Sequence, residues 1–247
     1  PTSTLSSSLA STGQYFGTGA LRFNGMLLRA SELRNKIAYV QQFDFHLPSL
    51  TVYETLLFHA RLRVNDSATS IVGSSLPKSD AIRKRVYEVL YTLNLVACMH
   101  VRVGDEVNKG ISGGEKRRLS IAVQLLVSPA VCLLDEPTTG LDAYTARRVV
   151  HLLRHIAHTP YTPAGFTPDN SHSPHTNIRT VILSIHQPRY DIFACFDDVI
   201  LLSKGQLVYA GNVEDMYTHF EHMGLPFPDL CNPADYLLDV SSIDVST

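Results

Sequence analysis

The fold of this chain is limited above all by an apolar run at residues 131–134 that ends in two carboxylates, Asp135 and Glu136. A short, continuous apolar run is typical of a strand that is buried on both faces of a parallel sheet. A second such run, residues 180–185, ends in His186. Because ligands of open α/β sheets bind beyond the carboxyl ends of the strands, we expect these polar side chains to face one ligand site.

Strands and helices alternate along the rest of the chain. Strands are predicted at residues 20–25 and 37–40, and residues 199–209 are predicted to form a hairpin that turns at Lys204 and Gly205. Helices are predicted from caps and apolar spacing. One begins at Thr51, one ends before Pro129, and one covers residues 212–223 and is stopped by Gly224. Two more have an apolar face: the first bears Ile82, Val86, Val89, Leu90 and Leu93, and the second, capped by Asp142, bears Ala146, Val149, Val150, Leu153 and Ile156. This alternation predicts an α/β fold with a mostly parallel sheet.

Composition places the chain among globular domains and excludes several classes. With 247 residues it can bury a full core, and the formal net charge of −2 lacks the basic excess of a surface that binds nucleic acid. The cysteines form no CxxC pair, so metal ligation and disulfides are not expected. No run approaches the roughly 18 apolar residues that cross a bilayer, so any membrane part is expected elsewhere in a longer polypeptide.

Three polar stretches interrupt the pattern of strands and helices. Residues 1–14 are rich in serine, and no structure is predicted for them. Residues 65–77 are predicted to be a polar loop. Residues 159–177 are rich in proline, threonine, serine and histidine, which predicts an exposed insertion.

The paired carboxylates after the strand have a specific chemical use. In P-loop NTPases, the aspartate at this position holds Mg²⁺ against the β- and γ-phosphates, which points to Asp135 here. The next carboxylate, Glu136, can orient and deprotonate a water molecule for attack on the γ-phosphate. The alternative is a solvated Asp-Glu-Pro turn.

The segment Ser112-Gly113-Gly114-Glu115 can form an anion site. Two glycines let the backbone approach a ligand, and the following helix offers unpaired N–H groups and the positive end of its dipole. The alternative is an ordinary capping box between the serine and the glutamate.

Two further strand ends carry side chains of interest. His186 can hydrogen-bond a γ-phosphate and the attacking water, although a histidine at a strand end is more often structural. Gln41 or Gln42, which follow Val40, can complete the shell of a metal ion, although glutamine there is commonly polar surface.

The order and spacing of these motifs together resemble the ATP-binding cassette (ABC) transporter family. In the terms of that family, Gln42 matches the Q-loop, residues 111–115 the signature and residues 131–136 the Walker B strand. Residues 139–142 match the D-loop, and His186 matches the H-loop.

The resemblance narrows to the G subfamily, the White-type sterol and multidrug transporters. The signature ends in Glu115 rather than glutamine, and the runs at residues 134–142 and 185–189 are similar to that subfamily. Residues 232–236, Asn-Pro-Ala-Asp-Tyr, are similar to its Asn-Pro-x-Asp-Phe element, with tyrosine where phenylalanine is usual. The match covers roughly residues 20–247.

The resemblance implies an α/β cassette of the P-loop NTPase type, with a mostly parallel core sheet and an α-helical subdomain that carries the signature motif. We expect a polar segment at residues 1–19 before the nucleotide-binding domain. Within the domain, we expect the helical subdomain at about 46–128, the core at about 129–211 and a family-specific segment at about 212–247.

No G-x-x-x-x-G-K-[ST] phosphate loop occurs in the chain. This Walker A loop supplies the N–H cradle and the lysine that bind the β- and γ-phosphates. In the family the loop lies upstream, and Glu136 and His186 are retained, so we interpret its absence as truncation. The isolated chain is therefore expected to bind ATP poorly.

The resemblance also implies a mechanism, in which ATP hydrolysis drives export of a hydrophobic or lipid-like substrate. Two such domains pair head to tail around two ATP molecules, and the signature of one domain serves the nucleotide of the other. The transmembrane domain is expected C-terminal in the same polypeptide, this domain on the cytosolic face of the membrane, and no nucleic acid as partner. The implied roles are catalysis for Glu136, His186 and Gln42, binding of Mg²⁺ for Asp135 and Gln42, and binding of ATP for Ser112, Gly113, Gly114, Glu115 and Asp142.

Two alternatives stay open from the sequence. A degenerate, non-hydrolysing cassette that dimerises or regulates is favoured by the missing Walker A loop and opposed by Glu136 and His186. A soluble cassette ATPase is the other, either a chromosome-maintenance head or a translation factor. The head needs a long heptad-bearing insertion that residues 43–111 do not provide, and the factor usually has basic surfaces that the charge of −2 does not match.

Overall fold

The computed structural model describes residues 22–23, 25–27, 36–63, 78–160 and 178–242. The chain divides into two compact units, residues 1–34 and 35–247. In the first unit, β1 (Arg22–Phe23) pairs antiparallel with β2 (Met26–Leu27) across a turn at Gly25, whose φ is +79°. The predicted first strand is present at Arg22–Phe23, and residues 20, 21 and 24 of its predicted range lie outside the described residues.

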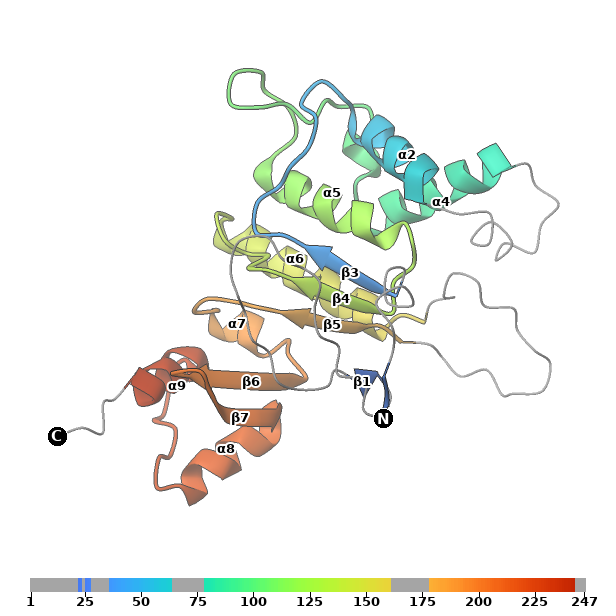
Figure 1. Ribbon diagram of the computed structural model, residues 1–247. Helices are drawn as coiled ribbons and strands as arrows, with labels where there is room; N and C mark the ends of the chain where they lie inside the picture. The colour runs from blue at the N-terminus through green and yellow to red at the C-terminus, as the bar shows by residue number, and fades with distance from the viewer. Residues whose placement is uncertain (1–21, 24, 28–35, 64–77, 161–177, 243–247) are drawn as a thin grey trace. The chain divides into compact units, whose positions relative to one another are not determined.

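A parallel three-stranded sheet forms the centre of the second unit (Figure 1). Its strands are β3 (Ile37–Val40), β4 (Val131–Leu134) and β5 (Thr180–Leu183), in that spatial order. Their last residues are paired in register, Val40 with Leu134 and Leu134 with Leu183. The α/β fold with a parallel sheet is therefore confirmed, and the three strands end at one edge.

Within the described part of the chain, the sheet is buried on one face only. Val40, Cys132 and Leu134 are buried, whereas Tyr39 and Ile182 on the opposite face are 50% and 48% exposed. Successive side chains of a strand point to opposite faces, so the burial alternates along β3 and β4. The expectation that β4 and β5 are buried on both faces was therefore wrong for the face that carries Tyr39 and Ile182.

Two helices cover the buried face of the sheet. Helix α5 (Gly113–Leu125) packs against β3, and α6 (Ala143–His158) packs against β5 (Figure 1). Asp142 caps α6 as predicted, because its carboxylate accepts a hydrogen bond of 3.0 Å from the amide of Thr145. The buried side chains of α6 are the predicted ones, Ala146, Val149, Val150, Leu153 and Ile156.

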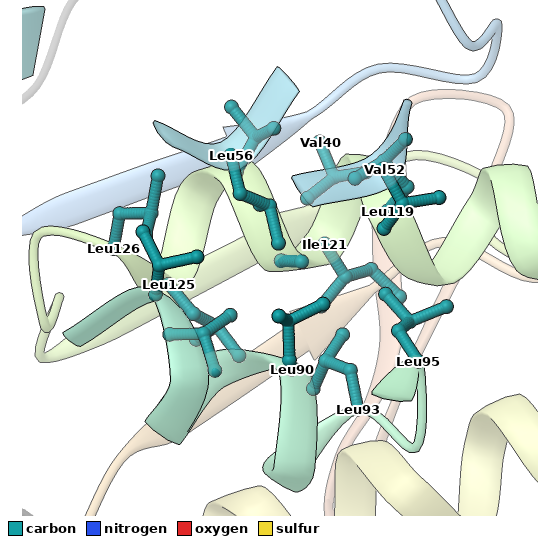
Figure 2. Packing of buried hydrophobic residues seen from close by; sticks show 14 of the residues in the cluster. Val40, Val52, Leu56, Leu90, Leu93, Leu95, Leu119, Ile121, Leu125 and Leu126 are labelled. Carbon is teal, nitrogen blue, oxygen red and sulfur yellow. The ribbon is translucent and has the colours of Figure 1, made fainter. Parts of the chain in front are cut away.

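Helices α2 (Val52–Arg63) and α4 (Lys78–Thr92) pack with α5 into a second layer. The predicted capping box starts α2: the Glu54 amide donates to Thr51 Oγ1 at 3.2 Å, and the Thr51 amide donates to Glu54 Oε2 at 2.8 Å. Figure 2 shows apolar side chains of all three helices meeting in one core, which includes Val52, Leu56, Leu90, Leu119 and Ile121. The apolar side of α4 is the predicted one, with Leu93 just beyond the helix and before a short 3₁₀ turn, η2 (Val96–Cys98).

The predicted hairpin is formed by β6 (Asp198–Ser203) and β7 (Gln206–Asn212), which pair antiparallel. Its turn residues, Lys204 and Gly205, have φ values of +49° and +76°, as a two-residue hairpin turn of type I′ requires. The predicted helix follows as α8 (Val213–His222), and the left-handed Gly224 lies just beyond its end.

Two helices near the C-terminus were not predicted. Helix α7 (Tyr190–Phe193) packs against α6, and α9 (Pro233–Ser242) packs against α7 and β6. The Asn232 side chain ties these parts together, because its Nδ2 donates to the Pro188 carbonyl at 2.9 Å and to Asp235 Oδ2 at 3.1 Å. The element at residues 232–236 therefore anchors the segment that follows β5.

Several expectations lie outside the described residues. They concern residues 1–14, the polar loop at residues 65–77 and the predicted insertion between residues 161 and 177. Within the ranges that the structure describes, no helix combines the length and the apolar character needed to cross a bilayer.

Candidate functional site

The polar side chains predicted from the sequence follow the parallel strands at the shared edge of the sheet. Gln42 lies two residues after β3, Asp135 and Glu136 directly follow β4, and His186 lies three residues after β5. Because the strand ends are in register, these segments approach one another although they are far apart in the sequence. This placement is the one expected for a ligand site of an open α/β sheet.

The Glu136 side chain is held by two hydrogen bonds at this edge. Its Oε2 accepts hydrogen bonds of 2.8 Å from Gln42 Nε2 and of 2.8 Å from the Thr139 hydroxyl. Its Oε1 accepts no hydrogen bond from the described residues. The φ of Glu136 is +41°, which is uncommon for a residue with a side chain and is held by the surrounding contacts.

Asp135 is fixed by two hydroxyl groups. Ser184, just after β5, donates to Asp135 Oδ1 at 2.8 Å and accepts from the Glu136 amide at 2.9 Å. The Tyr39 hydroxyl donates to Asp135 Oδ2 at 3.2 Å. Partial desolvation and this hydrogen bond raise the pKa of Tyr39, so its phenol stays a donor at neutral pH.

His186 takes no part in this hydrogen-bond network. Its side chain is exposed and makes no hydrogen bond to any residue in the described ranges. The next residue, Gln187, has a φ of +43°, so the chain turns sharply there. The structure thus brings Gln42 and Glu136 into contact and leaves His186 open to solvent.

The signature segment forms a cap of α5, separate from the Glu136 network. Ser112 and Glu115 form a complete capping box, with the Ser112 hydroxyl 2.7 Å from Glu115 Oε2 and the Glu115 amide 3.3 Å from Ser112 Oγ. Burial raises the pKa of Glu115, but these Ser112 hydrogen bonds outweigh it, so the pKa is lowered overall. The predicted capping box between Ser112 and Glu115 is therefore confirmed. The N-terminus of α5 stays exposed.

The two signature glycines have different surroundings. Gly113 is exposed, and a side chain there would meet nothing closer than Leu141 Cδ2 at 3.9 Å. Gly114 is buried, and a Cβ atom on it would overlap the methyl group of Thr145 in α6. Gly114 therefore serves the close packing of α5 on α6, whereas Gly113 leaves the backbone accessible.

Asp142, which the resemblance assigned to the nucleotide, is used by the fold itself. Its carboxylate caps α6, and the hydrogen bonds from the side chain and the amide of Thr145 lower its pKa. Asp142 is therefore ionised and occupied by the helix N-terminus. Its contact with a nucleotide stays a prediction.

The oxygen donors of the site suit Mg²⁺. This ion prefers hard oxygen ligands and is usually held by one or two carboxylates together with phosphate oxygens and water. Gln42 directs its Nε2 to Glu136, so its amide oxygen and the Asp135 carboxylate are the oxygens that can face a cation. The described residues contain no cluster of three or more histidines, cysteines or acidic residues that could hold a metal ion by itself.

Sequence reasoning missed two residues that organise this site. Ser184 bridges Asp135 and Glu136 but stands inside an apolar run with no motif of its own. Arg117 is only 3% exposed and binds the backbone on both sides of the Gln42–Glu136 contact. A charged residue at helical spacing from Gly114 and Ile121, on the apolar face of α5, was the available signal.

The comparison with protein families decides what kind of domain carries this site. The model described as "ABC transporter" matches residues 2–139, more than half of the chain. The chain belongs to the ABC transporter family. A second model, described as "ABC-2 type transporter", matches residues 186–244 of this ABC domain.

Relatives of this ABC domain support the G subfamily that the motifs predicted. A "Probable ATP-dependent permease" of Saccharomyces cerevisiae is 40% identical over 227 residues, which are 91% of this chain and 19% of the permease. "ATP-binding cassette sub-family G member 8" of Homo sapiens is 39% identical over 230 residues, covering 92% of this chain and 30% of that protein. Member 5 of Mus musculus is 37% identical over 242 residues, covering 96% and 33%. The chain thus spans a third or less of the length of these relatives.

A solved structure of similar fold also comes from an ABC system. It is cbiO1 from Clostridium perfringens, "Part of the ABC transporter complex cbiONQ", with a TM-score of 0.56 and 24% identity. The alignment covers 84% of this chain and 71% of cbiO1. This likeness confirms the predicted ABC-cassette fold.

Proposed function

We propose that this chain is the ATP-binding and ATP-hydrolysing domain of a membrane transporter that exports a hydrophobic or lipid-like substrate. The observation that carries the proposal is the Gln42–Glu136 hydrogen bond of 2.8 Å beside Asp135, at the carboxyl edge of the sheet of an ABC domain. A degenerate cassette that does not hydrolyse ATP would not need a carboxylate held in this orientation. The retained network therefore favours hydrolysis.

Glu136 is the general base in this proposal. Two donors hold its Oε2, so Oε1 is the oxygen left to accept the proton of a water molecule that attacks the γ-phosphate. The left-handed backbone at Glu136 and the Ser184 contact to its amide fix where that oxygen points. Exposed His186 is the residue of the same edge that can hydrogen-bond the γ-phosphate.

Asp135 and Gln42 are the residues that would hold Mg²⁺ with the phosphates of ATP. Such an ion neutralises the charge of the β- and γ-phosphate oxygens. Ser184 and Tyr39 hold the Asp135 carboxylate in place by hydrogen bonds. The donors therefore preorganise the acidic end of the site.

The signature segment is proposed to serve the nucleotide of a second, head-to-tail domain. Its capped helix N-terminus offers backbone N–H groups at Gly113, and the segment makes no hydrogen bond to Gln42 or Glu136. A helix N-terminus with an accessible glycine is suited to a phosphate. The exposed position of residues 112 and 113 supports contact with a partner rather than with the domain's own site.

The proposed organisation follows the elements of the fold. The helical subdomain, residues 46–128, contains α2, α4 and α5, and the core, residues 129–211, contains β4, α6 and β5. The C-terminal segment, residues 212–247, contains α8 and α9. A transmembrane domain following in the same polypeptide, with this domain on its cytosolic side, is supported by the match to the ABC-2 type transporter model.

The experiment that tests this function uses the full-length protein in lipid vesicles. ATP hydrolysis and ATP-dependent movement of lipid-like compounds are measured for the wild type and for Asp135→Asn. Both activities are expected in the wild type, and both are expected to fall together in Asp135→Asn because Mg²⁺ loses a charged ligand. A full-length protein without any ATP hydrolysis would overturn the proposal in favour of the degenerate cassette.

A further inference from the structure

Arg117 is a buried charged residue in the middle of this site. It lies on the face of α5 that packs toward the sheet, and it is 3% exposed. A buried guanidinium is costly unless it is paired and its N–H groups are hydrogen-bonded. The acceptors that satisfy Arg117 therefore show what it holds in place.

One side of the guanidinium binds the loop that carries Gln42. Arg117 Nη1 donates to the carbonyl oxygens of Gln41 at 2.6 Å and Gln42 at 3.1 Å, and it forms an ion pair of 3.1 Å with Asp44. These residues follow β3 and leave the sheet, so their carbonyl groups have no strand partner there. Arg117 takes the place of that partner.

The other side of the guanidinium binds the turn that carries Glu136. Arg117 Nη2 donates to the carbonyl oxygens of Asp135 at 2.8 Å and Glu136 at 3.1 Å, and Nε donates to that of Pro137 at 3.2 Å. The guanidinium offers five N–H groups in one rigid plane, and this set of acceptors uses all three of its nitrogens. Arg117 thus binds the carbonyl groups on both sides of the left-handed Glu136 backbone.

We infer that Arg117 is the positioning residue of the hydrolytic site, which holds the Gln42 loop and the Glu136 turn at the separation that their side-chain contact needs. Gln42 and Glu136 are 94 residues apart in the sequence, and Arg117 is bonded to the backbone carbonyl of each. This inference rests on the proposed role of Glu136 as the base. The acceptors of Arg117 are five backbone carbonyls and the Asp44 carboxylate, so its role is positioning rather than catalysis.

A second residue of α5, Ser120, also binds the loop that carries Gln42. The Ser120 hydroxyl, one turn after Arg117 on α5, donates to Asp44 Oδ1 at 2.6 Å and lies 2.8 Å from His46 Nε2. Asp44 is therefore held by two residues of α5 and presents its carboxylate to Arg117. The loop and the signature helix α5 are bound as one piece, so a shift of α5 shifts Gln42 with it.

Lysine cannot replace arginine in this arrangement. An ammonium group is a point charge with three donors, whereas the planar guanidinium reaches acceptors on two sides at once. Arg117→Lys therefore keeps the charge next to Asp44 but loses the hydrogen bonds to one of the two backbone segments. The expected consequence is a displaced Glu136 carboxylate in a domain that still binds ATP.

The test compares Arg117→Lys with Arg85→Lys in the full-length protein. Arg85 is a matched control, because it also binds backbone carbonyls of the α5 region, at Leu125 (2.6 Å) and Leu126 (3.1 Å), and forms an ion pair with Glu88 (3.2 Å). These contacts lie at the C-terminal end of α5, away from Gln42 and Glu136. The kcat and KM for ATP and the thermal unfolding of each variant are measured.

We expect Arg117→Lys to lower kcat on the order of 100-fold with an unchanged KM, because small misplacements of a reacting group have effects of that size. Arg85→Lys is expected to lower the unfolding temperature and to leave kcat unchanged. Equal kcat values for the two variants, or a loss in Arg117→Lys that appears only in KM, would overturn the inference.

Two further variants keep the test decisive. If Arg117→Lys fails to fold, Asp44→Asn replaces it, since this change removes the ion pair that orients the guanidinium between the two backbone segments; a kcat no lower than that of Arg85→Lys overturns the inference. Glu136→Gln separates the two proposals. Loss of turnover in Glu136→Gln with normal turnover in Arg117→Lys refutes the positioning role alone, whereas normal turnover in Glu136→Gln refutes the proposed base.

Discussion

Gly114 of α5 lies directly against Thr145 of α6, so that a single methyl group added to the glycine would overlap the threonine methyl group. This contact joins the signature segment to the helix that Asp142 caps. Gly114→Ala is expected to destabilise the domain by about 1–3 kcal/mol, because the two helices must separate to admit the methyl group. Thermal unfolding of the full-length protein measures the effect.

Gly113→Ala is the matched comparison, because a methyl group there meets nothing closer than 3.9 Å. Its unfolding temperature is expected to equal that of the wild type. Its ATPase rate is expected to fall, because the proposed partner nucleotide approaches the backbone at this position. Equal destabilisation by both substitutions would contradict the packing role given to Gly114.

Ser184→Ala is expected to lower kcat by roughly tenfold, since it removes a hydrogen bond to the charged Asp135 carboxylate, and such a bond contributes about 1.5–3 kcal/mol. The Ser184 hydroxyl bridges Asp135 Oδ1 and the Glu136 amide, so its loss loosens the Asp135 carboxylate and the backbone of Glu136. Steady-state ATP hydrolysis measures the effect. Ser79→Ala removes an exposed hydroxyl at the start of α4 and serves as the control, and an equal rate in the two variants would refute the bridge.

The protonation of His46 gives the domain a predicted dependence on pH. Burial lowers the pKa of His46, and the attraction of Asp44 opposes this effect without overcoming it. The unfolded chain therefore binds this proton more readily than the folded chain. Stability from the neutral ring is complete above the ordinary histidine pKa of about 6.5 and is lost as the pH falls through it toward the folded pKa.

Unfolding temperatures of the wild type and of His46→Gln between pH 7 and pH 5 test this dependence. Glutamine keeps a side-chain donor for Ser120 but has no ionisable ring, so its curve is expected to fall less steeply than that of the wild type. His222→Gln, at an exposed position at the end of α8, is the control and is expected to follow the wild type. Parallel curves for His46→Gln and the wild type would rule out the titration of His46.

The sequence predicted those parts of the fold that local patterns determine. The caps at Thr51, Ser112 and Asp142 and the turn at Lys204 and Gly205 depend on residues within a few positions of one another, and all are present. Helices α7 and α9 were missed because α7 is a single turn and both are stabilised by contacts with distant elements. The half-exposed face of the sheet was missed because an apolar run does not tell which face is covered.

The candidate site was also predicted in part, where local patterns determine it. Glu136 and Gln42 were predicted because both follow apolar strands, and parallel strands end at one edge of a sheet. The contact between them, the bridge through Ser184 and the six acceptors of Arg117 depend on the register of β3, β4 and β5. No local pattern encodes that register, so only the folded structure could reveal these partners.

In the proposed mechanism, the Glu136 carboxylate takes the proton of the attacking water. Steady-state ATP hydrolysis of full-length Glu136→Gln, measured together with its affinity for ATP, tests it most directly, because the amide keeps the size of the side chain and lacks its basicity. We expect an unchanged affinity for ATP and a rate lowered by about 10²–10⁴-fold, the usual contribution of a general base. A normal rate of hydrolysis in Glu136→Gln would contradict it.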